Sequence, residues 1–407
     1  MQQKIYVYAN GDSGSETAVT ADTADTADTV DTSDVNIDTT GVRKVIEKCF
    51  GKISINDEII ESAGSSECDW LAFSVGRYTD AYGKTDEFGN LDAYREALCG
   101  YVSRKYAQNG TGLHRSKATE WHRISLAMLA CGGNPEDSAS GSDGSVINII
   151  ADGTYNCVLG EPWRQGVNGA VYALITLDAV NCKVPEDARY DREDMIGYII
   201  SQELETGGFA LSGSRYDTDV TAMAVQALAR YYDSRDDVRG VIDRSLACLQ
   251  DGFGNNATYG NAASTAQVLL ALVTLGIDVT SDERFITEDG KNIIDGIMSF
   301  YDEDEAMFCL VKNTGPGFMA TTQCLYALTG WCRYNDGFSW LYDFVSFQGN
   351  PEKPQITQKP NVTQKPQITS RPQVTQKPEM TEEPIQTEMP DKGTLNEEVK
   401  GKYNNTD

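Results

Sequence analysis

The sequence predicts an all-α protein, an α6/α6 toroid in which six outer helices surround six inner ones. Five helical segments contain an Ala followed by Leu or Met, and these pairs recur every 44 to 56 residues, starting at Ala127, Ala173, Ala227, Ala271 and Ala327. This period fits a two-helix repeat. In each repeat the first helix is the more polar, and the second is rich in small and apolar residues, as expected for outer and inner layers. A further pair over 41–77 makes six, which can close without an open end.

Hydrophobic spacing gives the elements in chain order, beginning with a helix over 41–50 that has Val42, Val45, Ile46 and Cys49 on one side. Glycines such as Gly110 are expected to end the outer helices, because a left-handed residue satisfies the last carbonyl groups. The short helix over 144–150 is expected to break at Asp152. The predicted helices cover 41–50, 68–77, 90–107, 119–130, 144–150, 166–180, 191–202, 217–230, 238–250, 262–275, 291–301 and 320–334.

Two biased segments flank the helical region 41–348. Residues 1–40 repeat Asp and Thr with almost no bulky apolar side chains, so we expect them to be disordered. In 349–407, seven prolines recur at intervals of six from Pro354 to Pro390, which is typical of a semi-rigid spacer. The spacer favours association with a cell wall or surface, but no anchor motif follows it.

The composition excludes several classes of function. The 407 residues have a net charge of −27, which argues against a nucleic-acid partner. No apolar run is long enough to span a membrane. The ten cysteines contain no Cys-x-x-Cys pair, so zinc frameworks and redox motifs are not expected. Most of these cysteines fit small core side chains, and a disulfide or two stays open.

The N-terminus is relevant to localisation. Val7-Tyr8-Ala9 has the small-x-small pattern of a signal-peptide cleavage site, but the preceding apolar stretch is missing. Our hypothesis is a truncated signal peptide. We therefore expect a secreted or cell-surface protein, with a cytoplasmic location as the open alternative.

The two-helix repeats share a sequence pattern that is also found in a known family. A glutamine near a helix end leads to glycine and an aromatic residue, as in Gln202 to Phe209 and Gln250 to Phe253, and a small-residue helix follows. This pattern over about 41–348 resembles the terpenoid cyclase and protein prenyltransferase superfamily, which includes squalene cyclase. The stretches 263–278 and 321–343 look most similar to bacterial surface-protein toroids that occur beside transcobalamin-like domains.

The resemblance implies specific sites in the enzymatic branches. Prenyltransferases bind zinc through Asp, Cys and His, but this chain has only His114 and His122, both early, so no metal is expected. The Gly-Cys-Gly-Glu-Gln thioester motif does not occur. Cyclases carry Asp-x-Asp-Asp-Thr-Ala, and here Asp217-Thr218-Asp219-Val220-Thr221-Ala222 keeps the middle acid, which implies Asp219, beside Asp217, as a general acid. Val220 departs from the pattern, and the second helical domain of those enzymes is lacking.

Each of these residues also has a structural interpretation. Asp217 and Asp219 stand where a helix begins, and the favoured interpretation is that they cap it. An analogy with transcobalamin makes the loop residue His114 a ligand for a corrin cobalt. Several side chains in or beside the inner helices either pack in the core or line a pocket at one mouth of the toroid. These are Trp121, His122, Trp163, Tyr216, Tyr259 and Trp331. Trp70, in the predicted helix over 68–77, has the same two interpretations.

We therefore expect a non-catalytic, exported or surface-displayed toroid without a cofactor. Its ligand, bound at one mouth, would be a small molecule, a glycan or a protein. The alternative is a squalene cyclase-like enzyme that uses Asp219 as its acid. A purely structural spacer is a third interpretation, and it predicts no pocket.

Overall fold

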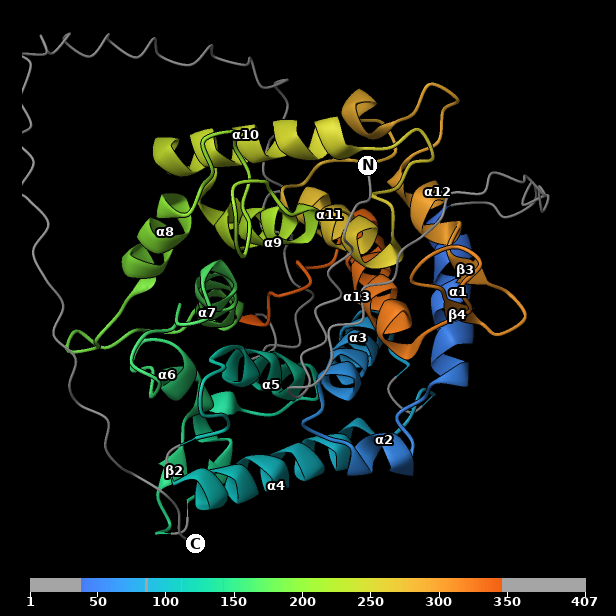
Figure 1. Ribbon diagram of the computed structural model, residues 1–407. Coiled ribbons are helices and arrows are strands. Elements are labelled where there is room, and N and C mark those ends of the chain that lie inside the picture. The colour runs from blue at the N-terminus through green and yellow to red at the C-terminus, as the bar shows by residue number, and fades with distance from the viewer. Residues whose placement is uncertain (1–37, 85–86, 111, 142, 346–407) are drawn as a thin grey trace, which may run out of the picture. The chain divides into compact units, whose positions relative to one another are not determined.

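A computed structural model describes residues 38–84, 87–110, 112–141 and 143–345 of the chain (Figure 1). These residues form thirteen α-helices, three short 3-10 helices and two small antiparallel hairpins. The predicted spacer and nearly all of the predicted N-terminal segment lie outside the described residues. None of the helices in the described part is long and apolar enough to cross a membrane.

The bounds of the helices are α1 Thr39–Lys52, α2 Asp57–Glu61, α3 Ser66–Tyr82, α4 Leu91–Asn109, α5 Thr119–Ala130, α6 Ile149–Gly153, α7 Val167–Ala179, α8 Arg192–Ser201, α9 Thr218–Leu228, α10 Asp236–Gly252, α11 Ala262–Thr274, α12 Ile293–Met298 and α13 Phe318–Asn335. The 3-10 helices are η1 Pro135–Asp137, η2 Ala229–Tyr231 and η3 Glu283–Phe285. The hairpins pair β1 Ala139–Ser140 with β2 Val146–Ile147, and β3 Tyr301–Asp302 with β4 Met307–Phe308.

The helices form two layers, as the alternation of polar and small-residue segments predicts. Helices α3, α5, α7, α9, α11 and α13 each pack on the next, and α13 packs back on α3, which closes an inner ring (Figure 1). The outer helices cover this ring, with α1 on α13, α4 on α3 and α5, α6 on α5 and α7, α8 on α7, α10 on α9, and α12 on α11. The described residues are therefore mostly helical and form an α/α toroid.

The inner helices run parallel to one another. This is shown by contacts that join the first turn of one helix to the first turn of another, and the last turn to the last turn. Asp219 and Ser264 pair the beginnings of α9 and α11, and Asp69 and Arg123 pair the beginnings of α3 and α5. At the other end, Arg333 of α13 reaches the backbone of Arg77 near the end of α3. We call the side where these helices begin the N-terminal pole, and the side where they end the C-terminal pole.

Close helix contacts depend on small residues. A Cβ atom at Gly76 in α3 would lie 2.1 Å from the carbonyl oxygen of Ala130 at the end of α5. Only glycine therefore allows these two backbones to approach so closely. The ten cysteines are all free; nine of them are buried and Cys99 is half-buried, in keeping with small core side chains.

Some boundaries differ from the sequence prediction. The predicted helix over 144–150 is wrong, because Val146–Ile147 is a strand and the helix runs over Ile149–Gly153. Asn148 decides this start, since its side chain accepts a hydrogen bond from the backbone N–H of Ala151. Asp152 thus lies inside the helix rather than breaking it. The toroid also begins earlier than expected, with Asp38 as the N-cap of α1.

Glycine ends one outer helix as predicted. Gly110 follows α4 with a φ of 78° and its N–H bonds to the carbonyl of Tyr106. The glycines at 207 and 208 have positive φ angles too, but they lie in the loop beyond α8, which ends at Ser201. The helix over 291–301 is shorter than predicted, because Tyr301 belongs to β3.

Candidate functional site at the N-terminal pole

The C-terminal pole is covered by the segment after α13, which we call the return segment, Phe338–Phe344. The buried guanidinium of Arg77 donates hydrogen bonds to its backbone carbonyls, at 2.7 Å to Leu341, 2.9 Å to Trp340 and 3.0 Å to Asp343. The Phe344 N–H bonds to the last carbonyl of α7, at Ala179. Charged donors on backbone carbonyls make strong bonds, so the return segment is firmly held.

A tyrosine of the return segment enters the ring of inner helices. Tyr342 stacks on Phe73 of α3, with ring centroids 5.6 Å apart. Its hydroxyl lies 3.5 Å from the side-chain oxygen of Gln226 on α9, and the Gln226 amide donates to Gln267 on α11 at 2.9 Å. Gln267 in turn bonds to the hydroxyl of Tyr326 on α13. Side chains from α3, α9, α11 and α13 thus fill the middle of the ring.

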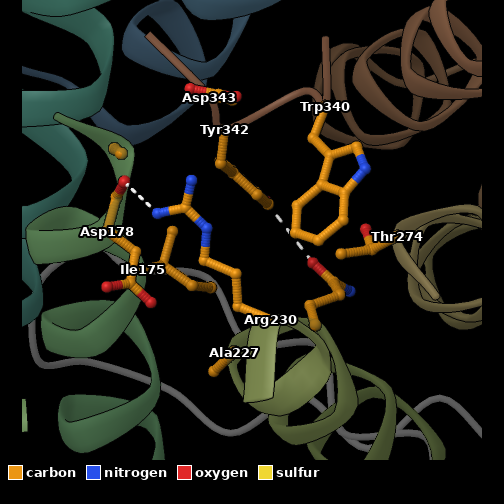
Figure 2. Close-up of a pocket in the computed structure, with 10 residues that line it drawn as sticks. Ile175, Asp178, Ala227, Arg230, Thr274, Trp340, Tyr342 and Asp343 are labelled. Atoms are coloured by element: carbon orange, nitrogen blue, oxygen red, sulfur yellow. Dashed lines mark hydrogen bonds between the residues drawn. The ribbon is translucent and has the colours of Figure 1, made fainter. Parts of the chain in front are cut away.

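A small pocket lies beneath the return segment. Its walls include Trp340 and Tyr342 on one side and Ile175, Ala227 and Arg230 on the other (Figure 2). Figure 2 also shows Arg230 reaching the backbone carbonyl of Asp178, a hydrogen bond of 2.8 Å. The pocket volume is about 30 Å³. That is room for a water molecule or two, far below the several hundred Å³ typical of ligand sites.

The N-terminal pole has a different character. Trp70 of α3, Tyr172 of α7 and Asp219 of α9 are partly exposed, although they lie on inner helices. About one turn deeper, Met223 and Tyr326 are buried, with 8% and 3% of their surface exposed. Solvent therefore reaches the inner face of the ring from this pole.

Aromatic rings form the floor at this pole. The ring of Trp70 lies 6.1 Å from that of Tyr172 and 5.6 Å from that of Tyr326, measured between centroids. The Tyr172 hydroxyl contacts the sulfur of Met223 at 3.3 Å. These contacts join α3, α7, α9 and α13 across the ring and hold the three rings in fixed positions.

Two side-chain carbonyl oxygens at this pole are buried without a hydrogen-bond partner. They are Oδ1 of Asn168 and Oε1 of Gln323. Asn168 precedes Tyr172 by four residues on α7, and Gln323 precedes Tyr326 by three on α13, so each shares the inner face of its helix with that tyrosine. A buried acceptor without a partner costs free energy, and such groups commonly mark a place for water or a ligand.

Asp219 bonds to its own backbone N–H and across to another helix, whereas the favoured expectation was that it only caps α9. One of its carboxylate oxygens accepts a 2.8 Å hydrogen bond from the hydroxyl of Ser264 on α11. Asp217 occupies the N-cap position of α9, but its side chain makes no capping bond and accepts from the N–H of Leu211 at 3.2 Å instead. The reason is tertiary, because the preceding loop draws Asp217 away and the second helical position turns Asp219 toward α11.

Burial raises the pKa of Asp219, and the negative charge of Asp217 raises it further. The hydrogen bond from Ser264 opposes this shift. Asp219 also raises the pKa of Tyr172 and that of Tyr326, although burial is the larger cause for both tyrosines. Within the described residues no cation forms a salt bridge with Asp219. The carboxyl group therefore lies among aromatic rings without a compensating positive charge.

The six side chains predicted to line a pocket are not brought together. Trp121 of α5 donates to the hydroxyl of Tyr106 on the outer helix α4 at 2.8 Å. Tyr216 and Tyr259 donate to backbone carbonyls of the outer helix α10, at Cys248 and Leu249. These three side chains therefore join the inner and outer layers instead of facing a common space.

The other three predicted pocket residues also do not face a common space. His122 is buried, with Nε2 at 2.7 Å from the carbonyl of Gly153, and burial lowers its pKa to about 4. Trp163, in the loop before α7, stacks on Tyr198 of the outer helix α8 with centroids 5.0 Å apart. Trp331 is buried near the end of α13.

His114 lies in the loop between α4 and α5. Its Nδ1 accepts backbone N–H bonds from Ser116 and Lys117, both at 3.1 Å. This nitrogen therefore orders a local turn, which leaves only Nε2 for another ligand. Among the residues that the structure describes, no three His, Cys, Asp or Glu side chains are grouped to hold a metal ion.

Sequence reasoning singled out Trp70 and Asp219 at the N-terminal pole but missed Asn168, Tyr172, Gln323 and Tyr326. One available signal was the presence of polar or aromatic residues on helices that are otherwise small and apolar. Asn168 and Tyr172, four apart on α7, are an example. The signal is weak, because nothing in a single helix tells its inner face from its outer one.

Among known proteins, only solved structures match this chain. No protein-family model matches the chain, and no curated protein matches it. Chains of solved structures do match, among them Candida albicans protein geranylgeranyltransferase-I complexed with GGPP. That match covers 71% of this chain and 91% of the other, at 11% sequence identity and a TM-score of 0.44. The chain is thus structurally similar, at low identity, to a protein prenyltransferase.

Proposed function

We propose that this protein is a non-catalytic α6/α6 toroid that binds a ligand at its N-terminal pole. The observation that carries the proposal is the difference between the two poles. The return segment covers the C-terminal pole, where Arg77 fastens it. At the N-terminal pole, Trp70, Tyr172 and Asp219 stay partly exposed on the inner face.

The unpaired groups support this choice of pole. The side-chain oxygens of Asn168 and Gln323 are buried there without partners, so a ligand that donates hydrogen bonds removes an existing cost. The aromatic floor supplies apolar contact area beside them. A few polar groups converging on an apolar surface is the usual make-up of a ligand site.

Export or surface display is part of the same proposal. The cleavage-like Val7-Tyr8-Ala9 and the proline-rich segment 349–407 support it. Protease treatment of intact native cells tests this part, because an exposed protein is cleaved while the cells stay closed. Full protection, with cleavage only after lysis, would move the protein to the cytoplasm.

A fragment screen by ligand-observed NMR tests the binding site. We expect fragments that bind the wild type to lose binding in Trp70→Leu, which removes the aromatic floor, and to keep it in Trp163→Leu. Trp163 is the matched control because it is also a half-buried tryptophan, but it stacks on Tyr198 of the outer layer. Loss of binding in Trp163→Leu instead of Trp70→Leu, or binding that neither change affects, would refute the aromatic floor around Trp70 as the site. A screen without any binding fragment would favour a structural spacer.

One observation favours a second function, that of a squalene cyclase-like enzyme with Asp219 as general acid. Burial raises the pKa of its carboxyl group, as a protonating acid needs, while hydrogen bonds from Ser264 and from its own backbone N–H oppose that shift. Against this, Asp219 is partly exposed, and carbocation chemistry requires the exclusion of water. Incubation with isoprenoid substrates separates the two functions. Turnover by the wild type that Asp219→Asn abolishes would establish the enzyme.

A further inference from the structure

We infer that the N-terminal pole recognises the ammonium group of a protonated alkyl amine, with the alkyl chain lying on Trp70 and Tyr172. This inference rests on the proposed function and names the class of ligand. It follows from the chemistry of the groups that are left unmatched at this pole.

The two buried oxygens without partners on α7 and α13, and the carboxyl group of Asp219 on α9, all attract a hydrogen-bond donor or a positive charge. The oxygens of Asn168 and Gln323 are acceptors, and Asp219 is a carboxyl group with a single partner on another helix, the hydroxyl of Ser264. An ammonium ion with several N–H donors satisfies such a set, and a neutral alcohol with one donor does not.

The aromatic floor adds an attraction of the same sign. The faces of Trp70 and Tyr172 carry negative potential, and cations bind to such faces within about 6 Å of the ring centre. Both side chains are partly exposed, so part of each ring is accessible from the pole. An alkyl ammonium ion therefore gains apolar contact and electrostatic attraction from the same two rings.

No resident cation takes this place in the described part of the chain. Arg123 begins α5 at the same pole, but it is buried and its guanidinium is fully engaged. It donates to Asp69 at 2.9 Å, to Glu120 at 2.8 Å and to the carbonyl of Gly64 at 2.9 Å. Its two acidic partners, Asp69 and Glu120, outnumber it, so this cluster of three side chains keeps a negative charge. A net charge of −27 further attracts cations to the whole protein.

Calorimetry with three simple probes tests the inference on the full chain. They are butylammonium chloride, which has charge and N–H donors, butyltrimethylammonium chloride, which has charge alone, and 1-pentanol, which is neutral and of similar size to butylammonium. We expect butylammonium to bind most tightly and pentanol at least about tenfold more weakly, because a hydrogen bond to a charged group contributes that much. Asp219→Asn should weaken butylammonium binding about tenfold and leave pentanol unchanged. Asp304→Asn, the same charge change at an exposed turn, should change neither.

The outcomes separate the ligand class from the site. Pentanol binding as tightly as butylammonium, with both lost in Trp70→Leu, would overturn the inference and leave the proposed binding pole intact. No binding of butylammonium up to 20 mM, or equal affinity in Asp219→Asn, would also overturn the inference. A fourth probe, Nα-acetyl-lysine amide, distinguishes the source of the amine. Tighter binding than butylammonium assigns the site to a lysine side chain, and weaker binding assigns it to a free amine.

Discussion

The guanidinium of Arg333 on α13 donates a 2.7 Å hydrogen bond to the backbone carbonyl of Arg77 on α3. Both guanidinium groups also reach the same carboxylate oxygen of Asp80, each at 3.0 Å. Their remaining donors go to the return segment, so the last inner helix, the first inner helix and the chain end are tied at one point. This junction is where the ring closes.

Replacing Arg77 should therefore be costly. In Arg77→Leu the return segment loses the hydrogen bonds to three of its carbonyls. Among the described residues, Arg333 then remains as the only partner of the Asp80 carboxylate. We expect a loss of about 3 to 5 kcal/mol in the free energy of unfolding, as for other broken buried ion pairs. Urea denaturation measures it. Arg239→Leu, which breaks an exposed pair with Asp236 on α10, should cost less than about 1 kcal/mol. Equal losses in the two variants would contradict the role of the junction.

Gly76 should not tolerate even one added methyl group. In Gly76→Ala the new Cβ would lie 2.1 Å from the carbonyl oxygen of Ala130, so α3 and α5 must separate. Overpacking of this kind costs about 1 to 3 kcal/mol. Gly197→Ala is the control, because its Cβ on the exposed face of α8 meets nothing within 4 Å. It should gain about 0.5 to 1 kcal/mol from helix propensity. Thermal unfolding of both variants checks the opposite signs.

His122 should make the protein sensitive to acid. Burial lowers its pKa from 6.5 to about 4, so between these pH values the unfolded chain binds more protons than the folded one. Its contribution to stability is complete above pH 6.5 and is lost as the pH falls toward 4, roughly 3 kcal/mol in all. His122→Gln keeps a donor for the Gly153 carbonyl and removes this dependence. Urea denaturation at pH 7 and pH 4.5 measures the difference.

The other histidine supplies the control for that experiment. His114→Gln makes the same substitution in the loop before α5 and leaves the buried contact between His122 and Gly153 intact. If His122→Gln retained the full acid sensitivity, another group would be responsible for it.

Asp219 should cost stability at neutral pH. Its pKa in the folded state is raised above the ordinary value of 3.8, so between these two pKa values the folded state binds more protons than the unfolded one. Stability therefore falls as the pH rises through that window. Asp219→Asn still accepts from Ser264, and it should unfold at higher urea concentration than the wild type at pH 7 but not at pH 3.5. In the described part of the chain, the titratable groups that face this carboxyl are the charged Asp217 at the N-cap of α9 and the neutral hydroxyls of Tyr172 and Tyr326 on other helices. A variant less stable than wild type at pH 7 would show that the ionised carboxylate stabilises the fold.

The helices were predictable because their signal is local. The Ala pairs at 127, 173, 227, 271 and 327 all lie on inner helices, where small residues let the backbones approach closely. Short elements escaped this reasoning. The stretch Val146–Gly153 holds a strand, a capping asparagine and a single helical turn, none of which spans enough residues for a period to emerge.

The candidate site was only partly predictable for a geometric reason. The cyclase-like motif pointed to Asp219 and Trp70 was a pocket candidate, but Tyr172, Tyr326 and the meeting of these side chains were missed because they come from helices far apart in the chain. Trp70, Tyr172 and Tyr326 belong to α3, α7 and α13. Their meeting depends on the rotation of each helix about its axis and on the heights at which the helices pack.

By itself, the sequence determined that the chain folds into two layers of helices, because small and apolar residues recur at helical spacing and at a constant repeat length. Only the tertiary structure decided which buried side chains face the centre of the ring. An inner helix is covered on nearly all sides, so its hydrophobic pattern does not distinguish Trp121, which faces α4, from Trp70, which faces the ring. Contacts between the helices make that distinction, and with it they select the pole at which a ligand can bind.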